Sequence, residues 1–198
     1  MMFENLEDRR LLSAAALTAG TLTVTGTAKN DTIYVAKKGT NLTVRVNKAT
    51  QTFKLADVKK MVVNALAGND NISFGYGTIG ATINAGDGND HVIGTSSGDT
   101  INGGAGNDYL HAWAGNDVVN GDAGNDVIIG CLGNDTIHGG AGNDLISGAQ
   151  GDDQIFGDAG NDTLFGAAGN DKVDGGDGKD VAGIGSTDIE AGIAVVVD

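Results

Sequence analysis

Hydrophobic residues recur at every ninth position through the second half of the chain. The series begins at Val92 and weakens at Ala182, and the residues between its members are mostly glycine, asparagine and aspartate. Self-similarity at a fixed short period is typical of architectures that stack identical units. The series consists of Val92, Ile101, Leu110, Val119, Ile128, Ile137, Ile146, Ile155, Leu164, Val173 and Ala182.

Each nine-residue repeat predicts a loop at positions one to six, followed by a short strand at positions seven to nine. Position eight holds the aliphatic residue, whereas positions seven and nine have no fixed polarity. Because side chains alternate across a strand, only position eight needs to face inward. Two strands facing each other across a thin core, joined by two loops, form one coil of about eighteen residues. The predicted fold is an all-β, right-handed parallel β-roll.

Residues 21–64 instead alternate apolar and polar positions, which predicts half-buried strands. Residues 37–41 read KKGTN, and this turn sequence predicts a hairpin. Residues 55–60 have room for one helical turn at most. Two weaker copies of the nonapeptide start at Gly26 and Ala65, and Asp70 lies twenty residues before Asp90. We therefore expect an N-terminal β region that caps the roll, with a two-residue insertion in one coil.

Composition narrows the classes of protein that fit the chain. Thirty-four glycines and no proline argue against both a helical protein and collagen. The formal net charge of −14 argues against nucleic acid and anionic membranes as partners, because both attract basic surfaces. No apolar run is long enough to span a membrane. With one cysteine, Cys131, the chain has no intramolecular disulfide to stabilise its fold.

One aspartate precedes the aliphatic residue by two positions in every repeat. Because a coil contains two repeats, these aspartates form two columns in which neighbours lie about 4.8 Å apart. Unit charges at this distance repel by roughly 1 kcal/mol in water and by about 3–4 kcal/mol at an effective dielectric constant of 20, so the columns need a counter-charge. One column contains Asp90, Asp108, Asp126, Asp144, Asp162 and Asp180, and the other contains Asp99, Asp117, Asp135, Asp153 and Asp171.

The repeats supply carboxylate and backbone carbonyl oxygens as metal donors. Their glycines permit backbone conformations that turn carbonyl groups between adjacent loops. Calcium accepts six to eight such oxygens in flexible geometry, whereas magnesium requires a strict octahedron. We expect the aspartates of the two columns to bind Ca²⁺, with Asp70 as a further candidate ligand. Binding of this kind supplies free energy of folding, so the metal-free chain is expected to be unfolded.

The repeats resemble the RTX (haemolysin-type) nonapeptide, G-G-x-G-x-D-x-U-x, in which U is a large aliphatic residue. Residues 103–111 read GGAGNDYLH, and residues 139–147 read GGAGNDLIS. The resemblance implies that each ion lies between neighbouring loops and is shared by their aspartates. It implies up to five ions in one column and four in the other, about nine in all. The loops around Trp113 and Ser97 depart from the consensus and are expected to bind calcium more weakly.

We predict four segments along the chain. They are an export-like, poorly ordered motif in residues 1–20, the β region in 21–84, the β-roll in 85–183 and a tail in 184–198. The tail is either a strand that caps the roll or, as the RTX resemblance implies, a secretion signal. The first segment resembles the L-E-x-R-x-L-L motif of bacterial exported surface proteins, and the alternative is a charged terminus without that role. The matching residues are Leu6, Glu7, Arg9, Leu11 and Leu12.

The function predicted from these features is that of a secreted bacterial protein, extracellular or at the cell surface, which folds on binding calcium and acts as a structural module. We expect a monomer without catalytic activity; a cell-surface or extracellular-matrix partner fits this location, but the sequence names none. Residues 94–98 read GTSSG, the G-x-S-x-G of serine hydrolases, yet they lie in a repeat loop. The alternatives are an adhesin-like module that binds carbohydrate and an RTX enzyme.

Overall fold

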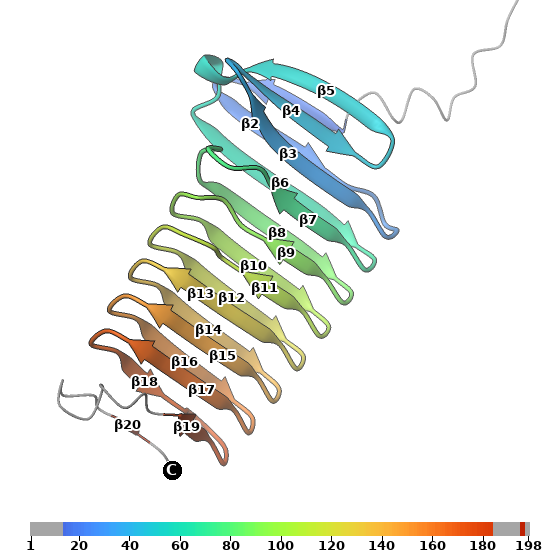
Figure 1. Ribbon diagram of the computed structural model, residues 1–198. Coiled ribbons are helices and arrows are strands. Elements are labelled where there is room, and N and C mark those ends of the chain that lie inside the picture. The colour runs from blue at the N-terminus through green and yellow to red at the C-terminus, as the bar shows by residue number, and fades with distance from the viewer. Residues whose placement is uncertain (1–13, 184–194, 197–198) are drawn as a thin grey trace, which may run out of the picture.

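The computed structural model describes residues 14–183 and residues 195–196. Its strands form two sheets, sheet A and sheet B, and from β6 onward the chain alternates between them (Figure 1). The result is a parallel β-solenoid of about seven turns with about 18 residues per coil, which confirms the predicted all-β roll. The L-E-x-R-x-L-L motif and most of the tail lie outside the described residues.

Within the described residues each sheet contains ten strands, which follow one another in space in the order below. Sheet A consists of β1 (Ala15–Thr18), β2 (Thr21–Thr25), β6 (Lys60–Ala67), β8 (Ala81–Asp87), β10 (Thr100–Ala105), β12 (Val118–Ala123), β14 (Thr136–Ala141), β16 (Gln154–Ala159), β18 (Lys172–Asp174) and β20 (Val195–Val196). Sheet B consists of β19 (Val181–Gly183), β17 (Thr163–Ala168), β15 (Leu145–Gln150), β13 (Val127–Leu132), β11 (Tyr109–His111), β9 (His91–Ile93), β7 (Asn71–Phe74), β3 (Thr32–Lys38), β4 (Asn41–Val46) and β5 (Ala49–Lys54).

An antiparallel meander of β3, β4 and β5 closes the N-terminal end of sheet B. Gly39 turns the chain between β3 and β4 with φ +63°, which confirms the predicted hairpin. A single 3-10 turn, η2 (Leu55–Asp57), follows β5, as the sequence allowed. Because β2 pairs in parallel with β6 and β3 with β7, the N-terminal strands continue the same two sheets. No helix in the described part of the chain is long and apolar enough to cross a membrane.

The register of the coils follows the sequence period. Ile101 pairs with Val119, eighteen residues later, and the other regular coils repeat this spacing. One coil is longer, since Ile72 pairs with Val92, twenty residues later. The two-residue insertion predicted in the early repeats is therefore present.

The strands are longer than predicted. β10 spans positions seven to nine of one repeat and positions one to three of the next, so that its loop is reduced to positions four to six. Within positions seven to nine only position eight is buried, as predicted. Two further positions are buried, namely the aspartate at position six, in the loop just before the strand, and glycine at position one, in the added part of the strand. Glycine carries no apolar signal, and this is why position one could not be assigned to a strand from its residue type.

The core is a single stack of aliphatic side chains between the two sheets. Ile101, Leu110 and Ile128 have no exposed surface, and the other position-eight residues from Val92 to Ile155 are equally buried. Burying each of these side chains stabilises the fold by about 1.5–3 kcal/mol. Most coils have glycine at position one, where a Cβ would overlap the carboxylate at position six of the same repeat. The aspartates at position six directly precede the strands and therefore lie at the two edges of the core.

Candidate metal-binding columns

Two columns of aspartates run along the roll, one at each edge where the chain turns between the sheets. Each aspartate directly precedes a strand, and all except the partly exposed Asp180 are at most 4% exposed. Column one precedes the strands of sheet B, and column two precedes those of sheet A. Column one contains Asp31, Asp70, Asp90, Asp108, Asp126, Asp144, Asp162 and Asp180, and column two contains Asp99, Asp117, Asp135, Asp153 and Asp171.

Each carboxylate except that of Asp31 uses one oxygen, Oδ1, to join neighbouring coils. Oδ1 of Asp126 accepts the backbone N–H of Asp108 at 2.8 Å, and Oδ1 of Asp135 accepts that of Asp117 at 2.9 Å. The second oxygen, Oδ2, is buried without a hydrogen-bond partner in most members of the columns. Such an oxygen is costly to bury, because it has lost water and gained no donor. The aspartates concerned are Asp70, Asp90, Asp108, Asp117, Asp126, Asp135, Asp144, Asp153, Asp162 and Asp180.

Burial raises the pKa values of these carboxyl groups. The pKa rises to about 7 for Asp108 and Asp117 and to about 6 for Asp126, in each case mainly because burial disfavours the charged form. Neighbouring carboxylates of the same column raise the pKa further, and the donated backbone N–H groups lower it. The columns are therefore short of positive charge, and a bound cation would favour the ionised carboxylates.

The glycines place backbone carbonyl groups beside the carboxylates. A Cβ on Gly121 would overlap both the carboxylate of Asp126 and the carbonyl oxygen of Gly139 in the next coil. At position four, Gly106 adopts φ +131°, and a Cβ there would overlap the carbonyl oxygen of Gly88. Only glycine combines this conformation with so close an approach. Carboxylate and carbonyl oxygens thus share the space between adjacent coils.

The donor set of the columns is made of hard oxygen atoms. In residues 14–183, no three side chains of His, Cys, Asp or Glu gather into a metal-binding cluster. An ion in either column would therefore take backbone carbonyl oxygens as well as carboxylates. This mixture suits calcium, which accepts many oxygen ligands in variable geometry.

Residues 76–182, more than half of the chain, match the family described as RTX calcium-binding nonapeptide repeat (4 copies). The chain belongs to this RTX family. The matched segments overlap along the roll, and they are residues 76–109, 93–128, 121–155, 129–164 and 147–182. No curated protein matches the sequence. The resemblance seen in the repeats is confirmed, and the RTX match covers the regular coils from the insertion onward.

Asp31 is a member of column one that the sequence did not single out. Its repeat, residues 26–34, has Lys29 at position four, where the RTX consensus has glycine. Asp31 is nevertheless 3% exposed, and its backbone N–H donates to Oδ1 of Asp70 at 2.7 Å. Its position-six register, two residues before the buried Ile33, is the signal that could have identified it.

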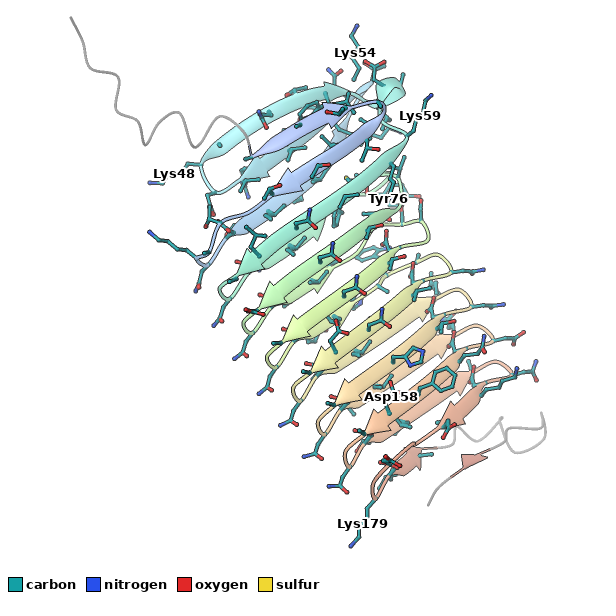
Figure 2. The ribbon with its side chains drawn as sticks, turned by 180° about the vertical axis from the view of Figure 1, so that it is seen from behind. Lys48, Lys54, Lys59, Tyr76, Asp158 and Lys179 are labelled. Atoms are coloured by element: carbon teal, nitrogen blue, oxygen red, sulfur yellow. The ribbon has the colours of Figure 1, made fainter. Side chains whose placement is uncertain are left out.

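Acidic residues at other positions of the RTX repeat lie outside the columns. Asp158, at position two, projects from the outer side of sheet A and is labelled in Figure 2. Its Oδ2 lies 3.0 Å from Nδ1 of His138, whose ring stacks on Phe156 at 4.5 Å. Position within the nonapeptide, and not residue type, therefore decides whether an aspartate belongs to a column.

Proposed function

We propose that this RTX chain is a secreted calcium-binding structural module that folds when ions bind between its stacked loops. The observation that supports the proposal is the row of buried Oδ2 atoms, such as those of Asp126 and Asp135, which lack a hydrogen-bond donor. A calcium ion between two coils would be held by the aspartates of both coils and by nearby carbonyl oxygens. It would supply the positive charge that the columns lack.

The proposed location follows from the calcium requirement. A chain that needs calcium to fold would stay extended where calcium is scarce and would fold after export from the bacterial cell. The net charge of −14 favours a soluble monomer through self-repulsion. Residues 1–20 are the proposed export-like motif, residues 21–84 the proposed cap and residues 85–183 the proposed roll. Residues 184–198 are proposed as a capping strand, with a secretion tail as the alternative.

Counting bound calcium tests this proposal. Isothermal titration of the full chain should show saturable binding of several Ca²⁺ ions per molecule. The same concentration of Mg²⁺ should give little heat, because the loops offer too many ligands in too irregular a geometry for magnesium. Titration without saturable calcium binding would contradict the proposed function.

The serine-hydrolase motif has no catalytic context in the fold. Ser96 is its central serine, and the hydroxyl oxygen of this residue accepts the backbone N–H of Gly77 at 3.4 Å. The strand β10 starts at Thr100, whereas a nucleophile elbow leads into a helix. We therefore propose a structural role and no hydrolytic activity for residues 94–98.

A second candidate function, carbohydrate binding, is favoured by one pocket. This pocket is lined by Phe74 and Tyr76 from one coil, by Thr95 and Ser96 from the next coil and by Trp113 from the coil after that. Tyr76 is 87% exposed and Trp113 is 48% exposed. Large aromatic side chains that gather on a surface are typical of binding sites. Exposed rings beside hydroxyl groups match the apolar faces and polar rims of sugar rings.

We expect sugar binding to change the fluorescence of Trp113, which is the one tryptophan of the chain. Glycans that bind in the presence of calcium should shift or quench this emission. The matched variant is Trp113→Gly, because Trp113 has φ +81° and glycine adopts this conformation without strain. The variant should fold and lose retention on a glycan array. A glycan that binds both proteins equally would rule out the pocket.

A further inference from the structure

Two aspartates differ from the rest of the columns, and they are the first described members of each. Asp31 heads column one and Asp99 heads column two. In column two the preceding coil has Ala81 at the aspartate position, and its backbone N–H donates to Oδ1 of Asp99 at 2.7 Å. Both first members are followed by regular aspartates whose Oδ2 atoms lack a donor, Asp70 and Asp117.

A threonine four residues earlier bonds each of these first aspartates. The backbone N–H of Thr95 donates to Oδ2 of Asp99 at 2.6 Å, and the Thr95 hydroxyl donates to Oδ1 at 2.9 Å. The backbone N–H of Thr27 donates to Oδ2 of Asp31 at 2.5 Å, and its hydroxyl lies 3.0 Å from the same oxygen. Asp31 receives a further bond from the amide of Asn47 at 2.5 Å. The Oδ2 atom, which lacks a donor in aspartates such as Asp70 and Asp117, therefore accepts a backbone N–H in Asp31 and Asp99.

The backbone at position two explains the difference. Thr27 and Thr95 occupy position two, and neither adopts a positive φ. A β-branched residue is strongly disfavoured in that conformation, because its side chain collides with the backbone. All position-two residues of the regular coils have a positive φ, and none of them is β-branched. They are Leu66, Gly86, Gly104, Trp113, Asp122, Cys131, Gly140, Ala149, Asp158, Ala167 and Gly176.

The changed backbone supplies a hydrogen-bond donor to Oδ2. At Thr95 the position-two N–H points at the carboxylate, and its partial positive charge occupies the side from which an ion would approach Oδ2. A calcium ion there would have to break this bond and would face the N–H dipole. We propose that Thr27 and Thr95 close the two columns by taking the place of calcium at Asp31 and Asp99.

This inference rests on the proposed calcium binding by the regular coils. It leaves Asp31 and Asp99 without a bound ion, so that the ion-binding part of each column begins at Asp70 and at Asp117. It also accounts for the departure of residues 94–98 from the consensus, since threonine at position two is a structural substitute for an ion. The sequence-based prediction that this loop binds weakly becomes a prediction that it binds none.

Calcium counting on matched variants of the full chain tests the inference. Asp99→Ala should bind as many ions as the natural protein, whereas Asp117→Ala, the next member of the same column, should lose about one. Restoring the consensus with Thr95→Gly and Ser97→Gly together should add one ion, because glycine can adopt the positive φ of the regular coils. Circular dichroism in calcium checks that each variant folds.

The possible results separate this inference from the proposed function. A natural protein that binds no calcium overturns both. If the natural protein binds several ions and Asp99→Ala loses as many as Asp117→Ala, the closure by Thr95 is wrong and the proposed function stands. An unchanged ion count in the Thr95→Gly, Ser97→Gly double variant, which removes no ligand, also contradicts the closure.

Discussion

Removal of calcium with excess EGTA should convert the far-UV circular dichroism of the chain from that of β-strands to that of coil. The columns bury carboxylates such as Asp108 and Asp117, and an unpaired buried charge costs several kcal/mol. One aliphatic side chain per nonapeptide cannot offset this cost together with the entropy of ordering nine residues. Millimolar calcium should restore the strand spectrum, because binding and folding are one equilibrium.

Magnesium is the control for this experiment. Replacing calcium with the same concentration of Mg²⁺ should leave most of the chain unfolded, since magnesium keeps its water and demands octahedral geometry. A strand spectrum that persists at neutral pH in excess EGTA would show that the roll does not depend on metal. The antiparallel meander of β3 to β5, whose ladder includes no column aspartate, should be the part that retains most structure.

The pH of the EGTA sample should matter, and the direction follows from the raised pKa values. The folded-state pKa is about 7 for Asp117 and about 6 for Asp153 and Asp162, compared with about 3.9 in an unfolded chain. The folded state then holds more protons between these values, so metal-free stability is highest at low pH and is lost as pH rises to about 7. Strand content in EGTA should be higher at pH 5 than at pH 8. Calcium affinity should be lower at pH 5 than at pH 8, because protons compete for the carboxylates.

The substitution Asp126→Ala should lower the number of bound calcium ions by about two and raise the calcium concentration needed for folding several-fold. Asp126 lies in the middle of column one, between Asp108 and Asp144, and its carboxylate is 1% exposed. An ion on either side would share this residue, so its loss should weaken two sites. Isothermal titration gives the ion count, and circular dichroism during a calcium titration gives the folding midpoint.

The matched control for this variant is Asp122→Ala. Asp122 lies in the same repeat and carries the same charge, but it is exposed at position two on sheet A. Removing it should leave the ion count unchanged and shift the midpoint little. If Asp126→Ala and Asp122→Ala behave alike, calcium responds to overall charge and is not held by the columns.

The fold of the roll could be predicted because the same residue types recur at a fixed spacing of nine positions. Aliphatic residues at every ninth position fix the core, and the spacing of Asp70 and Asp90 disclosed the insertion. Strand length could not be predicted in the same way, because glycine at positions one and two has no apolar signal, yet it lies within the strand. The position-six aspartates were recognised as a set, but their burial in the loop directly before each strand is seen only in the structure.

The closure of the columns by threonine lay beyond sequence reasoning for a different reason. Thr95 reads as a defect in the consensus, and its effect depends on the direction of one backbone N–H group. That direction follows from φ, which the residue type limits but does not determine. A substitution at one repeat position can therefore weaken an ion site or replace the ion with a hydrogen-bond donor. Only the backbone geometry distinguishes these two outcomes.

The constant register of the regular coils gives the molecule an adjustable length. Since neighbouring strands are offset by eighteen residues throughout the roll, a block such as residues 127–144 could be excised or duplicated without altering the alignment of the layers that remain. Each block brings its own aliphatic pair and its own two acidic side chains. The length of the RTX roll can thus change only in whole coils, by about 4.8 Å for each coil added or removed.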